Sequence, residues 1–204
     1  NSLRTAEGVI DAGARNTFSA LLRELGIRRD YAPVLADWLD ADGLPIKGGA
    51  EDSSYSGGGY LAANALLADI SELRLLQDFD PADYDILRDH VAALPAAGDN
   101  RATTYNINTL GAKLIKALAP SITTPELERI EAIQKRGGYT SVAAWVEASG
   151  ALAAIAGQLA VSSEFFEIVI TVTFAGRSAR LVTQLQRAAK DGDIRVLKRQ
   201  QLPD

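Results

Sequence analysis

Residues 166–174 read FEIVITVTF, and this stretch decides the fold class because its pattern is that of a β-strand. Successive side chains of a strand point to opposite faces, so an apolar residue at every second position builds one apolar face. The residues in these alternate positions are Phe166, Ile168, Ile170, Val172 and Phe174. The pattern therefore predicts a strand with one face that needs to be covered.

Two more strands are expected after it. Residues 175–178 form a turn, residues 179–187 a second strand, and KDGD at 190–193 is a hairpin signal before a third strand at 194–201. Three antiparallel strands in succession form a meander. We expect a helix to cover its apolar face, either from this chain or from a segment upstream of Asn1.

The first 160 residues have helical rather than strand periodicity. Capping residues, glycines and prolines predict where the helices begin and end. Trp38 and Trp145 lie at helical spacing among apolar residues, which predicts that both are core anchors. The predicted helices span about residues 16–26, 31–40, 80–94, 109–119, 124–136 and 142–148, with a short helix from Ser71.

These patterns predict an α+β fold, with a mostly helical domain followed by an antiparallel β-meander. We place the helical domain at residues 1–162 and the C-terminal strands at 163–204. A polar, glycine-bearing stretch near residue 100 divides the helical domain into subdomains of about residues 1–95 and 105–160.

Composition narrows the function classes. The 204 residues are 47% hydrophobic, which is enough for a substantial core, and carry a net charge of −5, which argues against nucleic-acid binding. Cysteine is absent and His90 is the single histidine, so a zinc site or a thiolate centre is not expected. Methionine is absent, so the chain does not start at an initiator residue, and we expect an upstream segment to precede Asn1. No apolar run in the chain approaches the length of a membrane span.

Residues 37–60 hold five carboxylates among glycines and aromatic residues. Crowded carboxylates repel one another unless a cation neutralises them, and calcium prefers oxygen ligands. Asp40, Asp42 and Glu51 match positions 1, 3 and 12 of an EF-hand loop, but the glycine is misplaced, so we predict a calcium site of another kind. The predicted ligands are Asp40, Asp42, Glu51 and Asp52.

Two other residues bear on this predicted site. Asp37 lies one helical turn before Asp40, and we expect it to support the ligands rather than bind the ion. Lys47 places a cation inside the acidic loop, where it either weakens the site or points to solvent. We expect such a site to stabilise the loop of residues 40–60 and to have no catalytic role.

The acidic stretch and its surroundings resemble the GspK family, the large minor pseudopilins of bacterial type II secretion systems. The matching segments follow the family's order along nearly the whole chain. They are NSL at 1–3, LADWLDAD at 35–42, GAEDSSY at 49–55, AN at 63–64, SEL at 71–73, YNINT at 105–109 and SEFF at 163–166. Leu110 departs from the family pattern, which usually has alanine there.

The resemblance implies a pseudopilin sheet with a large helical insertion that binds structural calcium in the acidic loop. It implies no enzymatic activity, and a periplasmic protein anchored in the inner membrane by a helix upstream of Asn1. The implied role is to cap the pseudopilus tip. The implied partners are the minor pseudopilins GspI, GspJ and GspH and the major pseudopilin GspG.

Other functions remain open from the residues alone. The first is a calcium-stabilised recognition module for secreted substrate. The second is a helix-hairpin-helix DNA-binding unit formed by residues 106–118, although its turn at 120–124 lacks the expected glycine. The third is a metal hydrolase or glycosidase that uses paired acids, but all the acids come from one loop. We expect neither an enzyme nor a nucleic-acid partner.

Overall fold

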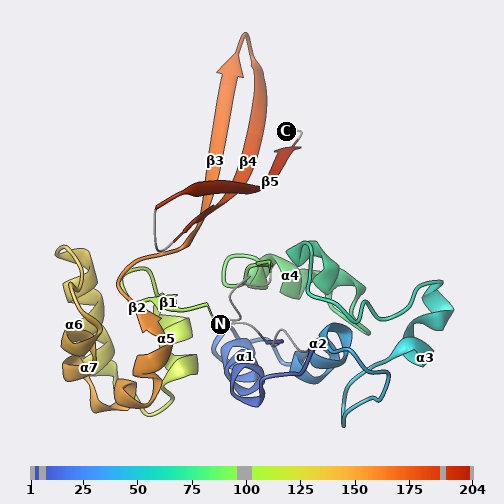
Figure 1. Cartoon of the computed structure of the whole chain (residues 1–204), viewed down its shortest axis with the longest axis horizontal. Helices are drawn as coiled ribbons and strands as arrows, with labels where there is room; N and C mark the ends of the chain where they lie inside the picture. Colours follow the sequence, from blue (N-terminus) through green and yellow to red (C-terminus); the bar gives the residue numbers. More distant parts are fainter. Residues whose placement is uncertain (1–2, 5–7, 96–102, 189–191, 203–204) are drawn as a thin grey trace. The chain divides into compact units, whose positions relative to one another are not determined.

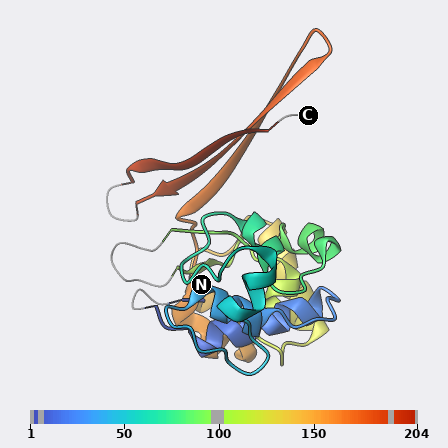
Figure 2. The same cartoon turned by 90° about the vertical axis from the view of Figure 1, so that its right-hand side faces the viewer.

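The computed structural model describes residues 3–4, 8–95, 103–188 and 192–202. The chain divides into two compact units, Asn1–Val161 and Ser162–Asp204. The first unit is mostly helical and the second is a three-stranded sheet, as Figures 1 and 2 show. Among the described residues, no helix is both long and apolar enough to cross a membrane.

The first unit consists of short helices joined by irregular segments. Its two very short strands, β1 (Tyr105–Asn106) and β2 (Leu159–Ala160), pair in parallel. The α-helices are α1 (Ala12–Glu24), α2 (Ala32–Leu39), α3 (Asp52–Tyr55), α4 (Pro81–Leu87), α5 (Ala112–Leu118), α6 (Thr124–Lys135) and α7 (Val142–Ala148). The 3-10 helices are η1 (Ser56–Gly58), η2 (Ile70–Leu75) and η3 (Gly150–Gln158).

Three predicted helix boundaries were wrong. Helix α1 begins earlier than Asn16, because the Asp11 carboxylate accepts a hydrogen bond from the Ala14 N–H and caps the helix. Helix α4 ends at Leu87 rather than near Leu94. Residues 88–90 form a turn instead of a further helical turn, and the His90 N–H donates to the Leu87 carbonyl at 2.8 Å.

The third wrong boundary is the start of α5, which follows Gly111 instead of Thr109. The Thr109 hydroxyl donates to the Asn106 carbonyl and so belongs to the preceding turn. The glycine-rich acidic loop contains two short helical segments, α3 and η1. Both are only three or four residues long, a length at which local turns form even in glycine-rich sequence.

Two hydrophobic cores stabilise the helical unit. Trp38 lies in a core built from α1, α2, η2 and α4, and Trp145 lies in a core built from α5, α6, α7 and η3. Both indole rings are buried, which confirms their prediction as core anchors. Helices α1 and α5 pack together, and the Lys113 ammonium donates to the Glu24 carbonyl at the C-terminal end of α1.

The side chains of Asn106 and Asn108 hold a turn in place through hydrogen bonds to the backbone. The Asn106 side chain accepts from the Asn108 N–H. The Asn108 side chain accepts from the Tyr139 N–H at 2.6 Å and donates to the carbonyls of Tyr139 and Val161. One amide therefore fixes the β1 segment, the α6–α7 connection and the last residue of the helical unit.

The second unit is an antiparallel meander of β3 (Phe165–Phe174), β4 (Arg177–Arg187) and β5 (Ile194–Leu202), in the order β3-β4-β5. Ala175 and Gly176 both have positive φ, which matches the tight turns that join twisted antiparallel strands. Of the predicted second hairpin at 190–193, residues 190 and 191 lie outside the described residues. The predicted α+β class, with helices followed by an antiparallel sheet, is confirmed.

The register of the sheet brings apolar side chains of β3 and β4 together on one face. Ile170 lies opposite Leu181, and Phe166 lies opposite Leu185. The alternate β3 residues predicted to form an apolar face are 41–82% exposed. They are Phe166, Ile168, Ile170, Val172 and Phe174.

Candidate metal centre

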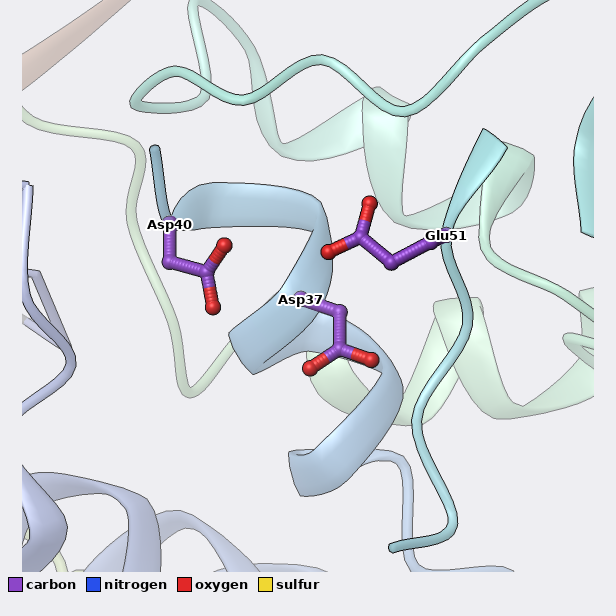
Figure 3. Close-up of side chains that lie close together, drawn as sticks. All are labelled: Asp37, Asp40 and Glu51. Carbon is purple, nitrogen blue, oxygen red and sulfur yellow. The ribbon is translucent and has the colours of Figure 1, made fainter. Parts of the chain in front are cut away.

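The acidic cluster is built where the chain leaves α2 and later returns to it. Asp37 lies in the last turn of α2, and Asp40 is the residue at its C-terminal cap. The apolar neighbours of Asp37 on this helix pack into the first core, which fixes the helix in place. The chain then passes through the loop and brings Glu51 back beside the end of α2, as Figure 3 shows.

The three carboxylates of Asp37, Asp40 and Glu51 form one compact group. Each offers an oxygen within 4.8 Å of the oxygens offered by the other two. Two oxygens that bind the same calcium ion at 2.3–2.6 Å lie at most about 5 Å apart. The spacing of the cluster is therefore compatible with a single shared ion.

The cluster is buried, although buried carboxylates are costly without compensation. Asp37 is 0% exposed, Asp40 8% and Glu51 4%. Both Glu51 oxygens and Asp40 Oδ1 are buried and have no hydrogen-bond partner. The C-terminal end of a helix also carries partial negative charge, which opposes acidic side chains there. Each of these features favours a cation in the cluster.

Asp37 is held by the returning loop. The Ile46 N–H donates to both of its carboxylate oxygens at 3.3 Å. Gly49 leaves room for the same carboxylate, because a Cβ atom at this position would overlap Asp37 Oδ2. The loop therefore packs against the Asp37 side chain and fixes the direction of its carboxylate.

The electrostatics of the cluster follow from burial and mutual repulsion. Burial raises the pKa of Asp37 and Asp40 above the ordinary aspartate value. Burial, and then the charges of the neighbouring aspartates, raise the pKa of Glu51 to about 7. Without a cation, the charged form of this group is disfavoured, and a divalent ion would reverse that balance.

The structure brings together only part of the predicted ligand set. Asp40 and Glu51 lie in the cluster, and Asp37 joins them. Asp42 and Asp52 are exposed and lie outside it. Their carboxylates accept backbone hydrogen bonds from Leu44 and Ala62. The prediction that Asp42 and Asp52 bind the ion therefore stays a prediction.

Asp37 was not among the predicted ligands, although the sequence contains a signal for it. Asp37 and Asp40 are three residues apart, which places two side chains on the same face of a helix. The apolar stripe of α2 also includes the neighbours of Asp37, so its burial was foreseeable. Lys47, in contrast, is exposed within the loop.

Three aromatic residues at and near the ends of the acidic loop pack against one another. Trp38 packs edge-on against Tyr55 with 5.1 Å between ring centroids, and Tyr60 lies 5.5 Å from Tyr55. Burial raises the pKa of the Tyr55 hydroxyl to about 12. These rings follow Asp37 and Glu51 closely in sequence, so the apolar packing of the loop and the acidic cluster are built from the same segments.

The fold and the cluster define a class of protein: a helical unit with a buried three-carboxylate centre, followed by an antiparallel meander with an exposed apolar face. Two family models, both described as type II secretion system (T2SS) protein K, match residues 1–96 and 105–162. The chain therefore belongs to the type II secretion system protein K family. The predicted GspK resemblance is confirmed.

Curated relatives support the same family. The chain is 35% identical to type II secretion system protein K of Pseudomonas aeruginosa strain PAO1 over 191 residues, covering 89% of this chain and 55% of the relative. It is 33% identical to the Klebsiella pneumoniae protein of the same name over 187 residues, covering 85% and 56%. The chain thus spans about half the length of these relatives.

A solved structure shares the fold. A chain of the GspK–GspI–GspJ complex from the type 2 secretion system of enterotoxigenic Escherichia coli superposes with a TM-score of 0.76 at 24% identity. The match covers 98% of this chain and 78% of that chain. Both the helical unit and the meander therefore belong to a fold already seen in a secretion assembly.

Proposed function

We propose that this chain is part of a minor pseudopilin of a bacterial type II secretion system, and that its work is assembly. The single observation that carries this proposal is the membership of the protein K family over most of the chain. The similar solved structure was determined as a GspK–GspI–GspJ complex, so we propose counterparts of GspI and GspJ as partners. We propose GspH and the major pseudopilin as further neighbours.

The sheet supports an assembly role. Five large apolar side chains of β3 share one face and stay 41–82% exposed. A contiguous apolar face of this kind is typical of a surface that another segment or protein covers. We propose that an N-terminal helix upstream of Asn1 covers this face and anchors the protein in the inner membrane, with both described units in the periplasm.

The helical unit supports a position at the pseudopilus tip. It adds about 160 residues to the sheet, and a body of that size is difficult to repeat at every position along a narrow helical filament. We therefore propose that this subunit caps the filament rather than extending it. No catalytic role is proposed, because a cap acts by occupying its place.

We further propose that the acidic cluster binds a structural calcium ion through Asp37, Asp40 and Glu51. Burial, oxygen spacing and the oxygens without hydrogen-bond partners support this proposal. The bound ion would supply positive charge that allows the loop to close against α2. Extracellular calcium modules bind at roughly 0.1 to 1 mM, so we expect an affinity in that range.

The predicted DNA-binding alternative finds no support at the turn between α5 and α6. The Glu126 carboxylate accepts from the Thr123 N–H at 2.8 Å, as part of the capping box at the start of α6. A phosphate bound at this helix start would meet that negative charge. We therefore do not propose a nucleic-acid ligand.

The direct test mixes this chain with the soluble domains of the GspI and GspJ counterparts from the same organism and measures the complex mass by light scattering. A stable complex with defined stoichiometry supports the assembly role. A parallel arm offers secreted substrates of the same system. Binding to substrate alone, with no pseudopilin complex, would replace the proposal with the recognition-module function.

A further inference from the structure

A cationic side chain from outside the acidic loop lies beside the cluster. Arg4 precedes α1 and forms an isolated antiparallel bridge with Ile10. The Asp11 N–H donates to the Leu3 carbonyl at 2.8 Å, which joins this segment to the start of α1. The backbone that carries Arg4 is therefore tied to the segment that leads into α1.

The position of the guanidinium is given by its contacts around Gly8. A Cβ atom at Gly8 would lie 3.0 Å from Arg4 Nη2 and 2.8 Å from the Cβ of Ala41. Gly8 has a φ of +86°, a backbone conformation that glycine adopts without strain. The glycine thus allows the Arg4 head group to lie next to Ala41, the residue that follows Asp40.

The charge of Arg4 acts on Asp40. Burial and the Asp42 charge raise the pKa of Asp40, whereas the Arg4 charge acts in the opposite direction. Arg4 is half-buried, and its Nε atom is shielded from solvent. Salt therefore screens this interaction less than it screens the charge of exposed Lys47.

We propose that Arg4 sets the calcium affinity of the acidic cluster by placing a fixed positive charge beside Asp40. This inference rests on the proposed calcium site. Three ionised carboxylates and one calcium ion carry a net charge of −1, and Arg4 brings the loaded site to neutrality. Because Arg4 also repels the ion, it lowers the affinity below that of the carboxylates alone. Affinity in calcium sites is tuned in the same way by the number of charges.

The test measures calcium affinity by isothermal titration calorimetry at pH 8 and 0.15 M salt, on the whole chain. Arg4→Gln removes the charge, Arg4→Lys keeps it, and Lys47→Gln removes an exposed charge from the loop. We expect Arg4→Gln to bind calcium roughly three- to tenfold more tightly. Arg4→Lys and Lys47→Gln should stay within about twofold of wild type, because one keeps the charge and solvent screens the other.

A purely structural role for Arg4 predicts the opposite sign, because a loosened site binds more weakly. Weaker or unchanged affinity in Arg4→Gln therefore overturns the inference. If that variant does not fold, the test is the nitrogen chemical shift of Arg4 Nε in the wild-type protein. The inference requires this shift to change when calcium is added, and an unchanged shift overturns it. Absence of calcium binding by wild-type protein would instead refute the proposed site itself.

Discussion

The carboxylate of Asp37 lies directly against the backbone of Gly49, so that a Cβ atom on residue 49 would lie 2.6 Å from Asp37 Cγ. This contact joins the last turn of α2 to the end of the acidic loop. It explains why a glycine stands at this position without any need for an unusual backbone angle. The loop closes on the helix only because residue 49 has no side chain.

This contact predicts that Gly49→Ala destabilises the fold by about 1–3 kcal/mol, because a methyl group is forced into an occupied space. Calcium affinity should fall with it, since Asp37 has to turn away. Gly43→Ala is the matched control, as a Cβ there has open space around it. Chemical denaturation and calcium titration of both variants check the prediction, and equal behaviour of the two would contradict it.

Because Glu51 is buried, we expect Glu51→Gln to raise the stability of the protein without calcium and to lower its stabilisation by calcium. In excess chelator at pH 8, Glu51→Gln should be about 1–3 kcal/mol more stable than wild type, because it removes a buried charge that lacks a partner. In calcium at ten times Kd, wild type should gain roughly 1.4 kcal/mol while the variant gains little. Thermal unfolding of both proteins in both buffers measures these differences.

The same unfolding experiment tests whether the ion is bound by the buried cluster or by the ligand set predicted from the sequence. Asp42→Asn and Asp52→Asn remove acids that the sequence predicted as ligands but that lie exposed outside the cluster. If Asp37, Asp40 and Glu51 hold the ion, both variants should keep the stabilisation by calcium, with only a modest loss of affinity. Loss of that stabilisation in either variant would restore the ligand set predicted from the sequence.

The Glu126 carboxylate, which lies outside the acidic cluster, should make the stability of the protein depend on pH. Hydrogen bonds from Thr123 lower the pKa of this carboxyl to about 2. A group whose pKa is lower in the folded state contributes stability above its unfolded value, and that contribution is lost as pH falls toward the folded value. The difference in unfolding midpoint between wild type and Glu126→Gln should therefore be present at pH 7 and disappear between about pH 4.5 and 2.

Glu128→Gln is the control for that series, because Glu128 is exposed on the same helix and takes no part in the capping box. Its midpoint should follow wild type at every pH. A constant difference between wild type and Glu126→Gln down to pH 2 would show that the capping box does not depend on the carboxylate charge.

If partners bind the exposed apolar face of the sheet, a charge placed on this face should weaken assembly without unfolding the protein. Ile170→Asp places a charge in the middle of the apolar face and should abolish or weaken at least tenfold any contact made through it. Thr171→Asp is the neighbour on the opposite face, where its side chain shares the surface with Arg180. Complex mass with pseudopilin partners, with circular dichroism as a folding check, separates the two variants. Equal assembly by both would refute a role for this face.

The sequence by itself determined the fold class. A period of two in residues 166–174 and helical spacing before it depend only on local geometry, and the tryptophans were visible as core anchors for the same reason. Helix ends were less predictable, since several residues near a terminus can cap it. At α1, Asp11 caps the helix although Asn16 is also a good capping residue.

Only the tertiary structure decided which acids meet. Asp42 and Asp52 are close to Asp40 and Glu51 in sequence, yet their side chains reach solvent. Asp37 is brought to Glu51 because α2 packs its apolar stripe into the core and the loop returns past Gly49. Sequence supplies the charges of the centre, but burial and the return path of the chain select which of them share a site.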